Sequence, residues 1–147
     1  MPDDTNVSGS ERIVLVQCTD SKRDVAARAR DLYDVSRYFR KQRAYAESVT
    51  DNWFIQSAKY GVIDPDAVIE PYDLRADEID EPEEWAGMIA ARIGANFSTD
   101  SVVEILGGSD YADPLTPLLE EMGFEVHEPL RGLRIGEREA KLEEAVA

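Results

Sequence analysis

Four short apolar runs along the chain have the pattern of β-strands. Ile13–Val16 is continuously apolar, which is typical of a central strand that is covered on both faces. Trp53–Ile55, Val102–Leu106 and Phe124–His127 are runs of similar kind. Because segments with helical spacing separate these runs, we expect parallel strands that are joined by right-handed crossovers.

The segments between the strands carry helix signals. Val25–Leu32 is compatible with a helix, and a longer helix is predicted after Ser36, whose hydroxyl can cap it. Pro82 begins a helix with acidic residues in its first turn and an apolar stripe of Trp85, Met88, Ile89, Ile93 and Phe97. Asp113-Pro114 opens another helix that ends at Gly123, and a short charged helix runs to Ala147.

The pattern predicts one α/β domain over residues 12–147. We expect three layers, with a four-stranded, mainly parallel sheet between helices. Residues 1–11 are polar and are interpreted as a disordered lead-in, and residues 64–80 as a long irregular excursion. Because no run approaches the roughly 18 apolar residues of a membrane helix, we expect no membrane partner and a cytoplasmic location.

The charge balance is strongly acidic. The chain has 31 acidic and 16 basic residues, with four lysines beside twelve arginines, a composition typical of halophilic proteins. Residues 20–61 nevertheless carry a balance of +3, and residues 62–128 carry −16. The distribution indicates either an ordinary basic stretch on an acidic surface or an anion near Lys22, Arg23, Lys59 and the Arg131/Arg134 pair.

The single cysteine and single histidine limit the possible chemistry. An internal disulfide is excluded, and a zinc site of Cys and His ligands is not expected. No metal or other cofactor is predicted. Cys18 is then either a packed strand end or a site residue, and His127 is the one histidine that could assist it.

Three polar patches follow directly after predicted strands. They are Cys18–Lys22, Ser57–Gly61 and Gly107–Tyr111. Because the carboxyl ends of parallel strands share one edge of a sheet, we expect these patches to converge on one crevice. Function is therefore sought at this edge.

Each patch offers chemistry beside a structural alternative. Asp20, Ser21 and Lys22 provide a carboxylate, a hydroxyl and an ammonium, or simply cap a turn. Lys59, Tyr60 and the proline-fixed Tyr72-Asp73 pair provide a cation, stacking rings and a carboxylate, or a stiff structural loop. The Gly107-Gly108 pair allows close approach of a ligand to the backbone.

A further set of residues resembles a known family. The set comprises Cys18, Ser21-Lys22, Asp31-Leu32-Tyr33, Ser57-Ala58-Lys59-Tyr60-Gly61, Pro65-Asp66, Pro71-Tyr72-Asp73, Gly108, Tyr111, Pro129-Leu130, Gly132-Leu133 and Ile135-Gly136. It resembles a family of small domains of unknown function, DUF6884-like, that looks related to YaaA-like proteins and, remotely, to the archaeosine-synthase and uracil-DNA-glycosylase-like superfamily. The resemblance implies a four-stranded parallel sheet and a link to nucleobases or nucleic acid. The histidine-bearing leucine loop of uracil-DNA glycosylases is missing from the sequence.

We therefore expect a protein that binds a nucleobase or nucleotide, free or within DNA or RNA, with N-glycosidic bond cleavage or base exchange as the candidate reaction. Asp20 or Asp73 is the expected catalytic carboxylate. The expected substrate-binding residues are Cys18, Ser21, Lys22, Ser57, Lys59, Tyr60, Tyr72, Gly107, Gly108, Tyr111 and Arg131. The alternatives are a non-catalytic module that senses a nucleotide or anion, and an interaction protein that docks an acidic partner on Arg37–Arg43.

Overall fold

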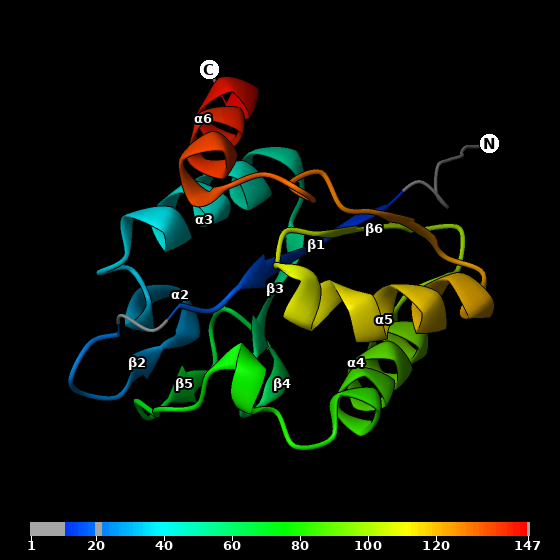
Figure 1. Cartoon of the computed structure of the whole chain (residues 1–147), viewed down its shortest axis with the longest axis horizontal. Coiled ribbons are helices and arrows are strands. Elements are labelled where there is room, and N and C mark those ends of the chain that lie inside the picture. The colour runs from blue at the N-terminus through cyan, green and yellow to red at the C-terminus, as the bar shows by residue number, and fades with distance from the viewer. Residues whose placement is uncertain (1–10, 20–21, 147) are drawn as a thin grey trace.

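A five-stranded sheet runs through the centre of the molecule (Figure 1). The computed structural model describes residues 11–19 and 22–146. The strands lie in the order β4-β3-β1-β6-β7, and their bounds are β1 Arg12–Gln17, β3 Asn52–Ser57, β4 Gly61–Ile63, β6 Val102–Ile105 and β7 Glu125–His127. Four of them are parallel, which confirms the predicted sheet, and β4 is an additional strand that pairs antiparallel with β3.

Helices cover both faces of the sheet. Helices α3 (Arg37–Val49) and α6 (Ile135–Val146) pack together on one face, and α4 (Pro82–Asn96) and α5 (Ser109–Met122) pack together on the other (Figure 1). The predicted α/β sandwich of three layers is thereby confirmed. The central strand β1 is fully buried from Ile13 to Val16, as its continuous apolar run predicts.

The helix signals read from the sequence agree with the observed ends. The Ser36 hydroxyl accepts a hydrogen bond from the Phe39 amide at 3.2 Å and caps α3. Pro82 occupies the first turn of α4. Gly123 ends α5 in a left-handed conformation, with φ of +109°, which only glycine adopts without strain.

The predicted helix at Val25–Leu32 is wrong. Ala27–Arg28 forms strand β2, which pairs antiparallel with β5 (Val68–Ile69), and α2 (Ala29–Leu32) is a single turn. The amides of residues 29 and 30 donate to carbonyls of residues 67 and 65, so the segment is fixed by the 64–80 excursion. That excursion also contains the 3-10 helix η2 (Ala76–Glu78) and is more regular than expected.

Two further expectations need correction. Helix α5 begins at Ser109 and not at Asp113, because the Gly108 carbonyl accepts from the amides of Tyr111 and Ala112 and closes a first turn. Met88 is 70% exposed and does not belong to the apolar stripe of α4. Among the described residues, no helix has the length and apolar character needed to cross a membrane.

Candidate functional site

The three polar patches lie together at the carboxyl edge of the sheet. The Cys18 amide donates to the Gln56 carbonyl at 3.0 Å, which joins the ends of β1 and β3. The Gly108 amide donates to Gln17 Oε1 at 2.9 Å, which joins the end of β1 to the turn after β6. The parallel strand order therefore produces the convergence that the sequence predicts.

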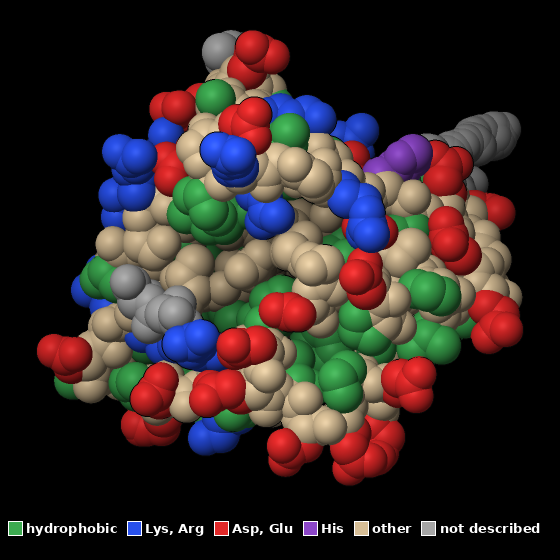
Figure 2. Space-filling model, viewed as in Figure 1, with side chains coloured by type: hydrophobic (Ala, Val, Ile, Leu, Met, Phe, Trp, Pro, Cys, Tyr) green, Lys and Arg blue, Asp and Glu red, His purple; other side chains and the backbone are tan. Residues whose placement is uncertain are grey.

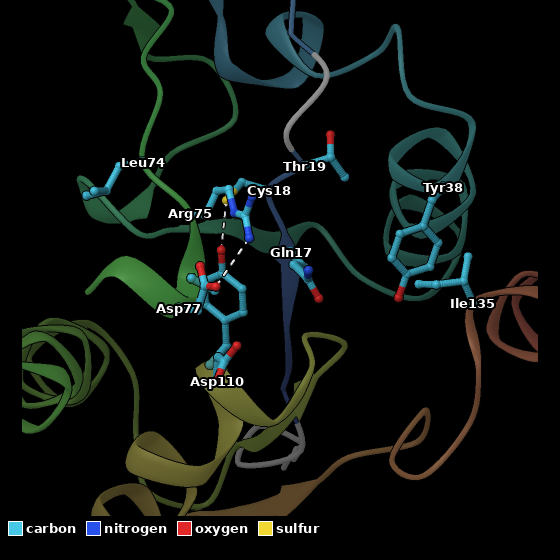
Figure 3. A pocket seen from close by; sticks show the side chains of 11 residues that line it. Gln17, Cys18, Thr19, Tyr38, Leu74, Arg75, Asp77, Asp110 and Ile135 are labelled. Atoms are coloured by element: carbon cyan, nitrogen blue, oxygen red, sulfur yellow. Dashed lines mark hydrogen bonds and ion pairs between the residues drawn. The ribbon is translucent and has the colours of Figure 1, made fainter. Parts of the chain in front are cut away.

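A cavity of about 460 Å³ opens at this edge. Its walls come from the end of β1, from α3, from the 74–77 segment and from the starts of α5 and α6 (Figure 3). The lining residues are Gln17, Cys18, Thr19, Tyr38, Leu74, Arg75, Ala76, Asp77, Asp110, Tyr111 and Ile135. The space-filling view shows a hollow in the middle of this face (Figure 2).

Charge is distributed unevenly around the hollow. Lysine and arginine side chains gather on the side of α3 and α6, and aspartate and glutamate side chains dominate the side of α4 and α5 (Figure 2). Within the cavity, Arg75 forms an ion pair with Asp77 at 3.2 Å. A ligand in this position would meet both cationic and anionic groups.

Cys18 forms part of the cavity floor. Its side chain is buried, and its Sγ lies 3.1 Å from the hydroxyl of Tyr111. Tyr111 in turn packs against Trp85, with ring centroids 5.6 Å apart. The thiol is therefore held by a neighbour from α5 that is itself fixed in the core.

Next to Cys18 lies a buried cluster of hydroxyl groups. Ser57 Oγ accepts from the amides of Lys59 and Tyr60, so its own hydrogen is donated to the hydroxyl of Tyr72 at 2.7 Å. Tyr72 also bonds to the hydroxyl of Tyr33 at 2.5 Å. These bonds fix the Tyr72 ring relative to the ends of β3 and α2.

The environment of this cluster favours neutral tyrosines. Burial, with smaller contributions from Cys18 and Tyr33, raises the pKa of Tyr72 far above its ordinary value. Burial likewise raises the pKa of Tyr33, with a smaller contribution from Cys18. Both rings therefore carry a hydroxyl, and not a phenolate, at neutral pH.

The ammonium groups of two lysines lie near the Tyr72 ring. Lys22 Nζ lies 4.5 Å from the ring centroid, and Lys59 Nζ lies 6.0 Å from it. Tyr60 stands edge-on to Tyr72 at 5.3 Å between centroids. Cations over an aromatic face are attracted to it, so this pair of lysines is held near the same platform.

The other predicted site residues that the structure describes do not line this cavity. Asp20 and Ser21 lie outside the described residues. Asp73 is exposed and does not line the cavity. Arg131 contacts Asp113 at 3.1 Å and Glu128 at 2.5 Å, and it lines a second hollow of about 280 Å³ beside Gly107 and Gly108.

Several residues of the site escaped the sequence analysis. Tyr38, Arg75 and Asp77 come from segments that carry no strand-end signal, and their contribution depends on how α3 and the 74–77 segment fold over the edge. Gln17 could have been found because it adjoins Cys18, and Asp110 lies within the predicted Gly107–Tyr111 patch, although the sequence pattern assigns it no role. The described residues contain no group of three or more potential metal ligands.

Glutamines support the strand ends. Gln17 and Gln56 are register partners on β1 and β3, and the Gln42 side chain exchanges hydrogen bonds with both backbone groups of Gln17 at 2.8 and 3.3 Å. Gln42 thus takes the place of a neighbouring strand where β6 has ended. The Gln56 amide is fully buried, and neither of its polar atoms has a partner in the described part of the chain.

These features define an α/β domain with a polar and aromatic cavity at the carboxyl edge of a mainly parallel sheet. Residues 13–144 match the model of a family of unknown function, DUF6884, and the chain belongs to that family. No curated protein and no solved structure matches the chain.

Proposed function

We propose that the protein binds a nucleobase or nucleotide in the cavity at the carboxyl edge of the sheet. The observation that carries the proposal is the combination of tyrosines, carboxylates and the Arg75 guanidinium around one opening of about 460 Å³. Small-molecule sites commonly occupy roughly 300 to 1,000 Å³ and combine apolar walls with a few polar groups that orient the ligand.

The lining offers the contacts that a base requires. Tyr38 and Tyr111 line the cavity but are only 9% and 3% exposed, so they offer a base apolar contact and their hydroxyl groups, and no open stacking face. Asp110 and Gln17 offer acceptors and an amide for the polar edge of the base. Lys22 and Lys59 on the Tyr72 platform are the proposed contacts to a phosphate or to a neighbouring nucleotide.

The candidate reaction is cleavage or exchange of an N-glycosidic bond. A carboxylate that orients water or stabilises positive charge at the sugar would supply the chemistry. Asp110 lines the cavity and is the carboxylate proposed for this role. Asp20, outside the described residues, and Asp73, outside the lining, remain predictions from the sequence. The resemblance to YaaA-like proteins and to the archaeosine-synthase and uracil-DNA-glycosylase-like superfamily supports nucleic acid as the source of the substrate. It does so by analogy of fold alone.

The alternative is a non-catalytic module that senses a nucleotide with the same cavity. Both functions are proposed for a cytoplasmic, salt-adapted protein, so assays belong at high salt. Incubation with free nucleosides, nucleotides, DNA and RNA separates the two functions. Released base identifies the enzyme, and binding without product identifies the module.

Calorimetric titration with nucleosides and nucleotides tests binding itself. Asp110→Asn is expected to weaken binding about tenfold, because it removes a charged acceptor from the lining. Asp100→Asn is the matched control, since Asp100 is an exposed residue that precedes β6 at the opposite edge of the sheet. Wild-type protein that binds none of these ligands at millimolar concentration would overturn the proposal.

A further inference from the structure

Arg138 of α6 stands beside the cavity without a carboxylate partner. Its Nε donates to the Leu133 carbonyl at 2.9 Å, and its Nη1 contacts the Tyr38 hydroxyl at 3.4 Å. The side chain is half-buried, and no ion pair links it to an acidic residue in the described ranges 11–19 and 22–146. Arg37, Arg43 and Arg131, by contrast, all lie against carboxylates.

The guanidinium lies over the Gly108 turn. A Cβ at position 108 would lie 3.7 Å from Nη1, 3.8 Å from Nη2 and 4.0 Å from Gln17 Oε1. Both terminal nitrogens of Arg138 therefore lie within ordinary contact distance of the space that the missing Gly108 side chain leaves. Gln17 and Tyr38 line the cavity, and Gly108 lines the second hollow, so this space lies between the two.

The electrostatics of this position favour an anion. Arg138 is a charge partly removed from water, and such a charge is costly unless it is paired. Gly108 precedes the first turn of α5, so the positive end of that helix faces the same space. The acidic residues of this region are Asp110, in that first turn, and Glu128, which lines the second hollow and is paired with Arg131. The chain has 31 acidic residues, yet none of the described ones neutralises Arg138.

We infer that the ligand carries a phosphate group and that Arg138 binds it in the space above Gly108. The inference rests on the proposed function, because the base would occupy the adjoining cavity. Arginine binds phosphate through two parallel hydrogen bonds. The Gly108 amide is already bonded to Gln17 Oε1, so glycine contributes free space at this position and no further donor. The substrate class is then a nucleotide, either free or as a unit of a strand, and not a free base or a nucleoside.

Titration of four probes tests the inference: a nucleoside, its 5′-monophosphate, the matching dinucleotide and inorganic phosphate. Wild-type protein is expected to bind the monophosphate at least about tenfold more tightly than the nucleoside. Arg138→Gln should abolish this difference and leave the affinity for the nucleoside unchanged. Arg134→Gln is the matched control, because Arg134 is an exposed arginine directly before the same helix. A dinucleotide that binds more tightly than the monophosphate identifies a strand as the source.

Gly108→Ala provides a second variant that leaves the arginine intact. Its Cβ would make ordinary contacts, and the backbone φ of −75° suits any residue, so the free protein should fold normally. The methyl group would occupy the space assigned to the phosphate and should weaken binding of the monophosphate alone. Equal affinities for nucleoside and monophosphate in the wild type would overturn the inference and leave the proposed function standing. Phosphate binding that depends on Arg138, without any binding of nucleoside, would support the anion site and contradict the base site.

Discussion

Removal of the Tyr72 hydroxyl tests whether the buried hydroxyl cluster fixes the platform beside the cavity. In Tyr72→Phe the ring remains, so contacts with the lysines are kept. Two hydrogen bonds are lost, one to Ser57 at 2.7 Å and one to Tyr33 at 2.5 Å. The change is therefore confined to the polar network.

The expected loss of stability comes from the polar groups whose hydrogen bonds Tyr72→Phe removes. The Tyr33 hydroxyl belongs to a fully buried residue and would lose its hydrogen bond to Tyr72, which leaves Ser57 as the hydroxyl that interacts with it. Ser57 keeps its two amide donors but loses the acceptor for its own hydrogen. A buried polar group without a partner costs about 1 to 3 kcal/mol, so we expect Tyr72→Phe to lower the free energy of unfolding by about 2 to 3 kcal/mol.

Urea denaturation and thermal melting, both at fixed high salt, measure this difference in the free energy of unfolding. At about 2 to 4 °C per kcal/mol for a domain of this size, Tm should fall by roughly 4 to 12 °C. Tyr60→Phe is the control, because Tyr60 is 39% exposed and its hydroxyl has no bond within the described residues, so its effect should stay within about 0.5 kcal/mol. Equal stabilities of the two variants would refute the reasoning about the cluster.

Three further predictions concern stability. Gln56→Met should raise the free energy of unfolding by about 1 kcal/mol, because it replaces a buried amide without partners by an apolar side chain of similar length. A fall in Tm would show that the Gln56 amide is hydrogen-bonded in solution. Burial and the hydrogen bond to Glu104 raise the pKa of Tyr45 to about 12, so the folded state keeps a proton that the unfolded state loses from about pH 10. This contribution to stability is complete below pH 10 and is lost as the pH rises to 12. Urea titrations at pH 9, 10 and 11 should therefore show that the free energy of unfolding declines less steeply for Tyr45→Phe than for the wild type. Gly123→Ala should lower the free energy of unfolding by about 1 kcal/mol, because the φ of Gly123 is +109°. Gly136→Ala, in an open position of α6, should leave stability unchanged or raise it. A lower Tm for Gly136→Ala than for Gly123→Ala in calorimetric melting would contradict this.

The sheet and the long helices could be predicted because local signals and tertiary packing agree. Ile13–Val16 is apolar on both faces because helices cover both faces, and Ser36 and Gly123 mark helix ends through their own backbone and side-chain chemistry. The small ribbon of β2 and β5 could not be predicted. Each of its strands has two residues, and their pairing depends on contacts between segments some 40 positions apart.

The site was predictable only where it follows strand ends. Cys18, Ser57 and Gly108 each come directly after an apolar run, and parallel pairing brings them to one edge. Tyr38 and Arg138 were missed because they lie on helices that cross this edge from one face. Helical periodicity indicates which side is apolar, and it does not indicate which polar residue faces a cavity.

Amide chemical-shift mapping by NMR is the most direct test of the account. Titration of labelled protein with a nucleoside 5′-monophosphate should give its largest shifts at Thr19, Gly108 and Tyr111, which surround the cavity and the space above the Gly108 turn. Shifts confined to the opposite edge, around Asp100 and Val102, or an unchanged spectrum at millimolar nucleotide, would contradict the assignment of the ligand site to the carboxyl ends of the strands.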